Sequence, residues 1–327
     1  MSGEGGPTPL SGPARPSAGT RGAQGRPRTS TRLPVTLPCP AYLGDHRADG
    51  RPVLPAVEAL QLLAAAVHGQ DPQLDVRRSR DAVFLRFLAI APSVARDEVW
   101  IELAPAEDGS AGVQAALCSK ARMGRAGLVR SLEHVRAVFG SPSLAPPQHA
   151  PTPGPGDLPA GRAFSFPAER LYAELVTFGP AFHNACGPVL LGTDGARCLV
   201  AAPAEGEGQD LTAPAAFPRL LGSPFPLDAA FHLACAWGQR HLGRVLFPTG
   251  YGERIVHRPI PARRRLLCQV RLCEQAADRA TFDLWLYEED GRLAEAARAV
   301  LLQDVFAGRI SVPAWVQAGC ARSERSA

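Results

Sequence analysis

Two long apolar segments with helical spacing stand out, one in each half of the chain. Residues 55–68 begin with a proline, which favours a helix start, and apolar positions then recur at the spacing of one helix face. That face consists of Val57, Leu60, Ala64 and Val67, with Leu63 beside them. Glu58 and Gln61 are the only polar residues between the ends, so the helix is expected to be buried on nearly all sides. A second apolar helix is predicted from the prolines at 224 and 226 to about Leu242.

Runs of alternating and β-branched residues follow each predicted helix. The predicted strands cover 83–87, 99–103 and 112–119 in the first half, and 187–192, 196–202, 266–273, 280–288 and 292–305 in the second. Three pairs of neighbouring runs are separated by Asp108-Gly109, Asp194-Gly195 and Asp290-Gly291, which are typical of tight hairpins. The strands are therefore expected to be antiparallel.

One long apolar helix followed by long strands, occurring twice, predicts an α+β fold made of two similar halves. A helix that is apolar on all sides needs an enclosure, so each half is expected to curl an antiparallel sheet around its central helix. The predicted boundaries are a disordered Arg/Gly/Pro-rich tail at 1–33, an N-terminal half at 34–140, a linker at 141–162, a C-terminal half at 163–313 and a C-terminal tail at 314–327.

Composition narrows the function classes only a little. Hydrophobic residues make up 46% and charged residues 20% of the 327 residues, which is ordinary for a globular protein. The net charge of +4 does not indicate nucleic-acid binding, and no apolar run is long enough to span a membrane. The N-terminus lacks the charged and apolar regions of a secretory signal.

The eight cysteines form no C-x-x-C pair. Two His-x-x-Cys pairs, His183/Cys186 and His232/Cys235, lack the further ligands of a structural zinc site. We therefore expect reduced thiols, no bound metal and a cytoplasmic protein.

The segment that leads into the first predicted helix has the residue types of a proton-transfer site. It holds His46, Gly50 and Pro55 in the pattern H-x-x-x-G-x-x-x-x-P. An imidazole with an ordinary pKa of about 6.5 is mostly neutral near pH 7 and suits a general base. Gly50 has no Cβ, so a substrate can approach its backbone amide, and Pro55 sets a helix start whose free amides favour negative charge. A plain type I′ turn at Asp49-Gly50 is the alternative interpretation.

The second predicted helix carries a carboxylate and an imidazole one turn apart. Asp228 lies in its first turn and His232 follows at i+4 on the same face, both among apolar residues. Burial would raise the pKa of Asp228 toward the protonated form that a general acid needs, whereas the helix dipole would lower it. Asp228 is predicted to be the acid and His232 its orienting partner. A base and an acid in separate halves suit the removal of a proton from one carbon and hydroxide from its neighbour.

A third segment, Phe178-Gly179-Pro180, precedes a short aromatic stretch. The ordered combination of His46/Gly50/Pro55, Phe178/Gly179/Pro180 and Asp228/His232 resembles the dehydratase domains of polyketide synthases and related fatty-acid synthases. The third motif departs from the family pattern Y-G-P-x-F because Phe178 replaces the tyrosine. An aromatic wall for the acyl tunnel remains, and the hydroxyl is lost.

The resemblance covers about 34–313 and implies a double hot-dog fold with one active site between the halves. It implies that a 3-hydroxyacyl group on the phosphopantetheine arm of an acyl carrier protein loses water to give a 2-enoyl thioester, without metal or organic cofactor. The carrier would be met in trans, with other synthase subunits as further partners. The run Arg263-Arg264-Arg265 is a candidate docking patch for an acidic carrier, or simply a solvated strand edge.

Two other function classes stay open. One is a non-catalytic acyl-carrier-binding or scaffolding module, to which the loss of the tyrosine at Phe178 would be suited. The other is a product-template-like cyclase or a double-bond isomerase, because these reactions also begin with proton abstraction beside a carbonyl.

Overall fold

The computed structural model describes residues 30–92, 94–123, 128–140, 163–203 and 219–318, together with Gly154, Asp157, Pro159 and Ala160. The strands of its N-terminal half are β1 (Thr31–Leu37), β2 (Arg47–Ala48), β3 (Arg51–Pro52), β4 (Arg78–Phe84), β5 (Arg96–Pro105), β6 (Val113–Met123) and β7 (Leu128–Phe139). Those of its C-terminal half are β8 (Phe164–Pro167), β9 (Ala185–Leu191), β10 (Gly195–Ala201), β11 (Phe247–Val256), β12 (Arg265–Gln275), β13 (Arg279–Tyr287) and β14 (Leu293–Gln303).

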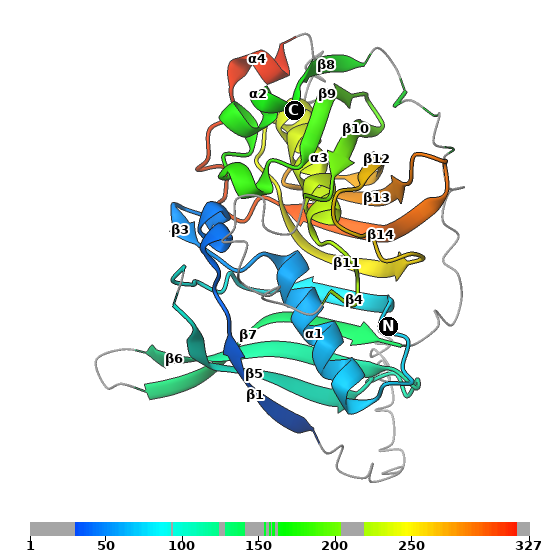
Figure 1. Cartoon of the computed structure of the whole chain (residues 1–327). Coiled ribbons are helices and arrows are strands. Elements are labelled where there is room, and N and C mark those ends of the chain that lie inside the picture. Colours follow the sequence, from blue (N-terminus) through cyan, green and yellow to red (C-terminus); the bar gives the residue numbers. More distant parts are fainter. Residues whose placement is uncertain are drawn as a thin grey trace, which may run out of the picture.

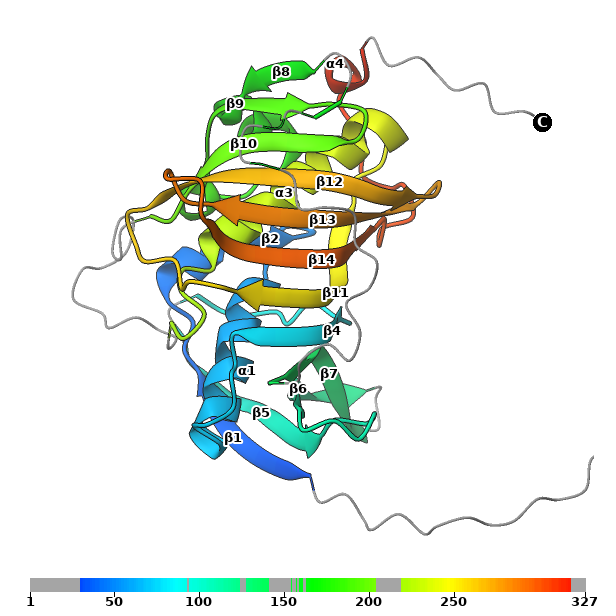
Figure 2. The ribbon, with the colours of Figure 1, turned by 90° about the vertical axis from the view of Figure 1, so that its right-hand side faces the viewer.

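The long strands form one antiparallel sheet that continues from one half into the other. Within the described residues this sheet has twelve strands in the order β1-β5-β6-β7-β4-β11-β14-β13-β12-β10-β9-β8, and β2 with β3 makes a separate hairpin. Strands β4 and β11 join the halves, with Ala82 opposite Tyr251 and Arg80 opposite Glu253. Figure 2 shows the strands stacked in this order from β1 to β8. The expectation of two sheets is therefore corrected, because the β4–β11 pairing leaves no edge between them.

Two long helices lie against the concave side of this sheet. Helix α1 (Ala56–Gln70) packs on β5, β6 and β7, and α3 (Phe225–Leu242) packs on strands of the C-terminal half, chiefly β10, β12 and β13. Figure 1 shows α1 over the N-terminal strands and α3 among the C-terminal ones. The two helices also contact each other, and the buried apolar residues of both halves form one continuous core. The two predicted helices are confirmed, and the polar residues Glu58 and Gln61 of α1 are fully buried as expected.

The remaining helical segments are short. They are η1 (Ala41–Asp45), α2 (Ala168–Arg170), η2 (Leu171–Leu175), η3 (Pro180–Phe182) and α4 (Ala314–Gln317). None of the helices in the described ranges combines the length and apolar character needed to cross a bilayer.

Several strands differ from the sequence prediction. Strand β1 begins at Thr31, so the last residues of the predicted tail 1–33 belong to the sheet, and α4 lies inside the predicted tail 314–327. In place of the strand predicted at 83–87, the structure has β4 at Arg78–Phe84, so the two overlap only at residues 83 and 84. Strands β7 and β11 were not predicted, since β7 holds scattered charges and β11 contains Pro248 and two glycines that suggest a loop. Most of the predicted linker 141–162 lies outside the described residues.

Candidate functional site

A two-residue hairpin before α1 positions His46. Strands β2 and β3 pair Ala48 with Arg51, and the loop residues Asp49 and Gly50 have φ of 50° and 72°, which makes a type I′ turn. The hairpin returns Val53 to His46, so that the Val53 N–H donates to the His46 carbonyl at 3.0 Å. The Val53 carbonyl oxygen in turn lies 3.2 Å from Nδ1 of His46. If Nδ1 carries the proton and donates to this carbonyl, Nε2 is left unprotonated.

The turn therefore explains why the H-x-x-x-G pattern has a glycine at position 50. A Cβ on Gly50 would meet no atom within 4 Å, but its φ of +72° disfavours any L side chain. The turn interpretation thus holds at this position, although Gly50 also lines the cavity described below. Pro55 was predicted to be substrate-binding. It is instead the buried residue that precedes the first turn of α1, and it does not line the cavity, whereas its neighbours Leu54 and Ala56 do.

Asp228 and His232 lie together at the start of α3, as their spacing predicts. Their side chains are only 6% and 5% exposed, and Nε2 of His232 is 3.0 Å from Oδ2 of Asp228. The two groups are close but poorly aligned for a hydrogen bond, and the carboxylate oxygen Oδ2 has no hydrogen-bond partner among the described residues. Burying an incompletely paired carboxylate destabilises the folded protein, so its presence here indicates a functional role.

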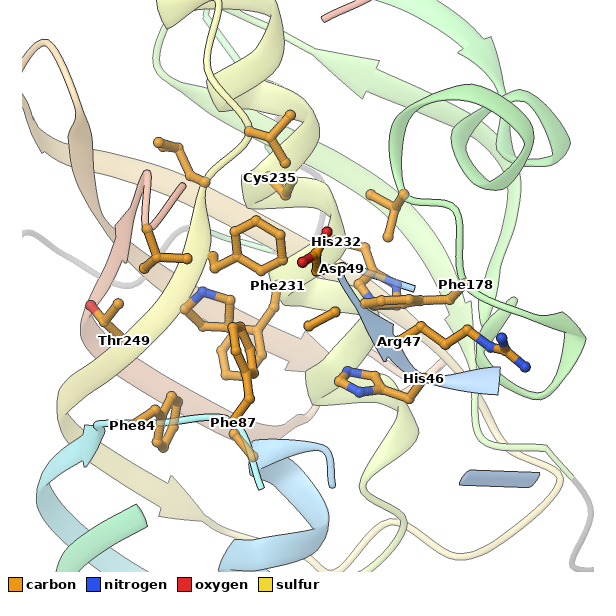
Figure 3. A pocket seen from close by; sticks show the side chains of 18 of the residues that line it. His46, Arg47, Asp49, Phe84, Phe87, Phe178, Phe231, His232, Cys235 and Thr249 are labelled. Atoms are coloured by element: carbon orange, nitrogen blue, oxygen red, sulfur yellow. The ribbon is translucent and has the colours of Figure 1, made fainter. Parts of the chain in front are cut away.

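A cavity of about 670 Å³ brings these residues from the two halves together. His46, Gly50, Phe178, Asp228 and His232 all line it. The Phe178 ring lies against both imidazoles, with centroid distances of 4.4 Å to His46 and 5.1 Å to His232. Figure 3 shows this ring between the two histidines, with Phe84, Phe87 and Thr249 at the other end of the cavity.

The residues after Phe178 connect the halves and do not line the cavity. The Gly179 N–H donates to the Asp45 carbonyl at 2.8 Å, and the Ala181 N–H donates to Oδ2 of Asp45 at 3.0 Å. A Cβ on Gly179 would lie 2.3 Å from the Asp45 carboxyl carbon, so only glycine fits. Pro180 begins the short helix η3 and is exposed. Of the three residues predicted to bind substrate in this segment, Phe178 alone lines the cavity, and Gly179 packs on Asp45 next to His46.

Burial shifts the pKa values of the two proposed proton carriers in opposite directions. Burial lowers the pKa of His46, an effect that the Asp228 carboxylate partly opposes, so the imidazole is neutral near pH 7. Burial acts to raise the pKa of Asp228, but the His232 imidazole and, to a smaller extent, His46 outweigh it and hold the pKa below its usual value of 3.8. The resting site therefore contains a neutral His46 and an ionised Asp228.

A buried polar network that the motifs did not indicate fixes the two halves relative to each other. Glu58 on α1 accepts hydrogen bonds at 2.6 Å from both the Tyr42 hydroxyl and the Arg219 guanidinium. The Gln61 side-chain amide donates to the Gly222 carbonyl at 2.6 Å. Residues 219–222 lead directly into α3. The sequence signal was the pair of polar residues inside an otherwise apolar helix, which indicated buried partners without identifying them.

The predicted basic patch lies away from the cavity, whereas Cys235 lines it. Arg265 lines a separate surface depression with Glu288, Glu289 and Asp290, whose carboxylates offset its charge, so the surroundings do not favour a purely basic patch at 263–265. The described cysteines are all free thiols. Within the described ranges, no group of three or more His, Cys, Asp or Glu side chains is arranged to hold a metal ion.

Comparison with solved structures finds the same fold in dehydratase domains. The dehydratase domain from the CurF module of the Curacin polyketide synthase matches with a TM-score of 0.62 and 18% identity, over 86% of this chain and 95% of that one. The dehydratase domain of RzxB from Pseudomonas fluorescens matches with a TM-score of 0.60 and 17% identity, over 84% and 94%. That of a mycocerosic acid synthase-like polyketide synthase gives 0.59 and 19%, over 84% and 90%.

Comparison with curated proteins gave no match. A family model does match: residues 155–308 fit the "Polyketide synthase dehydratase N-terminal domain". The matched range includes Phe178, Asp228 and His232, while His46 lies outside it. Residues 155–308 are therefore similar to the polyketide synthase dehydratase family, and the described chain has the fold of the hot-dog dehydratase domains that it matches.

Proposed function

We propose that this protein is a double hot-dog dehydratase that removes water from a 3-hydroxyacyl thioester on an acyl carrier protein and releases a 2-enoyl thioester. The observation that carries the proposal is that His46 from one half and Asp228 from the other line the same largely apolar cavity. A base and an acid must act on adjoining carbon atoms, and a shared cavity is the minimum requirement for that.

His46 is the base in this proposal. With the proton on Nδ1 donated to the Val53 carbonyl, the lone pair of Nε2 is free to take the C2 proton. The lowered pKa of His46 keeps the imidazole neutral before the reaction. The electrons of the C2–H bond form an enolate, whose oxygen would be met by the amide of Gly50 or by the free amides at the start of α1, where Ala56 lines the cavity.

Asp228 is the acid, oriented by His232. The enolate collapses, the C3–O bond breaks, and the hydroxyl leaves as water with the carboxyl proton of Asp228. The C2 proton on His46 is afterwards lost to solvent, and Asp228 regains a proton. Because the pKa of Asp228 is lowered in the free site, only a minor fraction of the protein holds a neutral His46 and a protonated Asp228 together. This mechanism therefore predicts a distinctive pH dependence, given in the Discussion.

The substrate arrives on a phosphopantetheine arm, and Phe178 forms part of the wall around its acyl group. The proposed step needs no metal or organic cofactor, because proton transfer and C–O cleavage are complete with the two side chains. The carrier is a partner in trans, and the free thiols suit a cytoplasmic enzyme working beside other synthase subunits.

The test is a mass-spectrometric turnover assay with purified protein and a series of 3-hydroxyacyl carriers. We expect interconversion of 3-hydroxyacyl and 2-enoyl species, and a fall of about 10²- to 10⁴-fold in kcat for His46→Ala and for Asp228→Asn. Full activity in either variant would refute the assigned roles. Binding of acyl carriers without turnover of any of them would favour the scaffolding alternative.

A further inference from the structure

Exposed apolar side chains gather at one end of the cavity. Among the described residues, Leu85, Phe87, Val305 and Ile310 are 39–45% exposed and all line it. Phe306 lies beside them on the same wall. These five residues are called the apolar rim below. Large apolar side chains gathered at the surface around a cavity mark a site for an apolar ligand, because leaving them in water is otherwise unfavourable.

The aromatic rings of the rim pack on one another. The Phe87 ring lies 6.0 Å from that of Phe247 and 6.5 Å from that of Phe306, and the Phe247 and Phe306 rings are 5.3 Å apart. Phe247 meets both of the other rings edge-on and Phe87 stacks on Phe306, and both arrangements are favourable for aromatic pairs. The rim thus continues the apolar wall of the cavity at Phe247 to the outside of the protein.

Buried polar contacts hold the first segment of the rim in place. The N–H groups of Leu85 and Arg86 donate to the His134 carbonyl at 2.8 and 3.3 Å, and Nδ1 of His134 lies 3.3 Å from the Arg86 carbonyl. The Ser119 hydroxyl is 2.8 Å from Nε2 of the same imidazole. The backbone carbonyl and both ring nitrogens of His134 therefore have hydrogen-bond partners. These contacts fix the backbone of the segment that carries Leu85 and Phe87.

The second segment of the rim is held by a carboxylate. Asp304 accepts hydrogen bonds from the N–H groups of Phe306 at 3.1 Å and Gly308 at 2.6 Å. This arrangement closes the loop that presents Val305, Phe306 and Ile310. Both segments of the rim are thus anchored by local hydrogen bonds, so the open end is part of the folded structure.

The two ends of the cavity differ in chemistry. Along α3 the wall includes Asp228 in the first turn and Cys235 two turns later, so the cavity follows the helix away from the proposed acid. At the other end the wall comprises the β2–β3 hairpin, with the exposed residues Arg47, Asp49 and Gly50. Figure 3 shows Arg47 beside His46 on one side, and Phe84, Phe87 and Thr249 on the other. The amides and phosphate of a phosphopantetheine arm suit the polar hairpin, and a hydrocarbon chain suits the apolar rim.

One cation also lines the apolar end. Arg86 is exposed there, and its guanidinium donates to the Glu133 carbonyl at 3.2 Å. Arg86 alternates with Leu85 and Phe87 along the chain, and it is the charged group that an arm entering at this end would meet. An experiment must therefore distinguish whether the rim binds the hydrocarbon tail or the phosphopantetheine arm.

We infer that the site takes 3-hydroxyacyl groups with a long apolar tail, which passes along α3 and leaves the protein through the apolar rim. The inference rests on the proposed function for the reaction, and adds to it the class of substrate. A tail that ends inside the cavity leaves the rim in water, whereas a longer one covers it. Polar substituents on the distal part of the tail would lose hydration there without finding partners.

The test compares 3-hydroxyacyl N-acetylcysteamine thioesters of increasing chain length. These small thioesters lack the carrier and most of the arm, so length dependence reports on the acyl tail. We expect kcat/KM to rise with each added methylene by up to about fourfold, until the tail has passed the rim. A flat series, or one that falls beyond short chains, would overturn the inference.

Leu85→Asn and Leu199→Asn form a matched pair of variants. Both leucines are exposed, at 43% and 44%, but Leu199 lies on β10 away from the cavity. Leu85→Asn is expected to lower kcat/KM of the longest substrate about fivefold and to leave the shortest unchanged, and Phe87→Asn to do so more strongly. Leu199→Asn should change neither. Equal losses at all lengths would mean that the rim receives the arm, and would end the proposal.

Binding of saturated acyl thioesters keeps this result separate from the reaction. These compounds have no hydroxyl to eliminate, so calorimetric affinity for long against short chains measures the tail site alone. Tighter binding of the long chain in the wild type, lost in Phe87→Asn, supports the inference even if no thioester is dehydrated, and that outcome would remove only the proposed function. Equal affinity for both lengths would contradict the inference whatever the activity.

Discussion

His46 and Asp228 face the same cavity, but the chain holds them in different ways. His46 lies in a hairpin before α1, and its polar contacts are to backbone groups: the Val53 carbonyl at Nδ1 and the Val53 N–H at the carbonyl of His46. Asp228 lies inside the first turn of α3, where its nearest partner is another titratable side chain, His232. One region uses backbone geometry and the other uses a second side chain.

The difference follows from what burial does to each group. Burial lowers the pKa of a histidine and so favours the neutral imidazole, which can stay in an apolar wall with one backbone partner. Burial penalises an ionised carboxylate and raises the pKa of Asp228, and the His232 imidazole one turn away is the main effect that outweighs it. A neutral base is thus easier to bury than a carboxyl group. The protonation state of Asp228 is therefore the property of the site that a change of pH is expected to alter.

The largest effect on stability is expected from breaking the buried ion pair that connects the segment before α3 to α1. Arg219→Ala removes the guanidinium that binds Glu58, whose side chain is fully buried, and leaves a buried carboxylate with only the Tyr42 hydroxyl. Breaking such a pair costs about 3–5 kcal/mol. Urea denaturation should show a loss of this size.

The double variant Arg219→Ala with Glu58→Gln is the control, because a neutral amide at position 58 removes the unpaired charge. It is expected to recover part of the stability. A loss below about 1 kcal/mol in the single variant would show that the network does not hold the halves together.

The pH dependence of kcat/KM distinguishes the two proton carriers. If Asp228 must be protonated while His46 is neutral, kcat/KM falls about tenfold for each pH unit above the pKa of His46, since the protonated fraction of Asp228 shrinks while neutral His46 is already saturated. If His46 both takes and returns the proton, kcat/KM rises to a plateau there. Initial rates from pH 6 to 9, corrected for uncatalysed thioester loss, decide between them. A plateau would make the acid role of Asp228 wrong.

A smaller effect is expected at the turn that positions His46. Gly50→Ala forces a side chain into φ of +72° and is expected to cost about 1 kcal/mol and to lower kcat as the Val53–His46 contacts loosen. Gly69→Ala is the matched control, since Gly69 lies in α1 with open space around it. It should be neutral or stabilising by up to about 1 kcal/mol. Thermal unfolding and turnover of both variants check this, and equal behaviour would show that the turn is not required.

The smallest effect is expected at the position where the family tyrosine is absent. Phe178→Tyr adds a hydroxyl to a ring that lines the cavity, so unfolding free energy should change by less than about 1 kcal/mol. If the wild type is a dehydratase, its kcat/KM should change less than about threefold. Activity that appears only in Phe178→Tyr would indicate that the wild-type site has lost the reaction and would favour the scaffolding alternative.

Local pattern was sufficient for the elements whose apolar residues repeat without interruption. The helical spacing after Pro55 and before Leu242 predicted α1 and α3, because a helix face is encoded within a few turns of chain. The strand at β11 was missed, since Pro248 and its glycines suggest a loop and only pairing with β4 and β14 makes it a strand. The same pairing joins the two halves into one sheet, and no local pattern encodes it.

For the site, the sequence by itself determined which groups can carry protons and on which elements they stand. The i, i+4 spacing of Asp228 and His232 and the turn glycine after His46 are local facts, and the structure keeps them. Only the tertiary structure decided that Phe178 lies between the imidazoles, that Gly179 packs on Asp45, and that the pKa of Asp228 is lowered. Distances across more than a hundred residues and the balance of burial against nearby charge depend on how the whole chain packs, and the spacing of residues along it does not contain them.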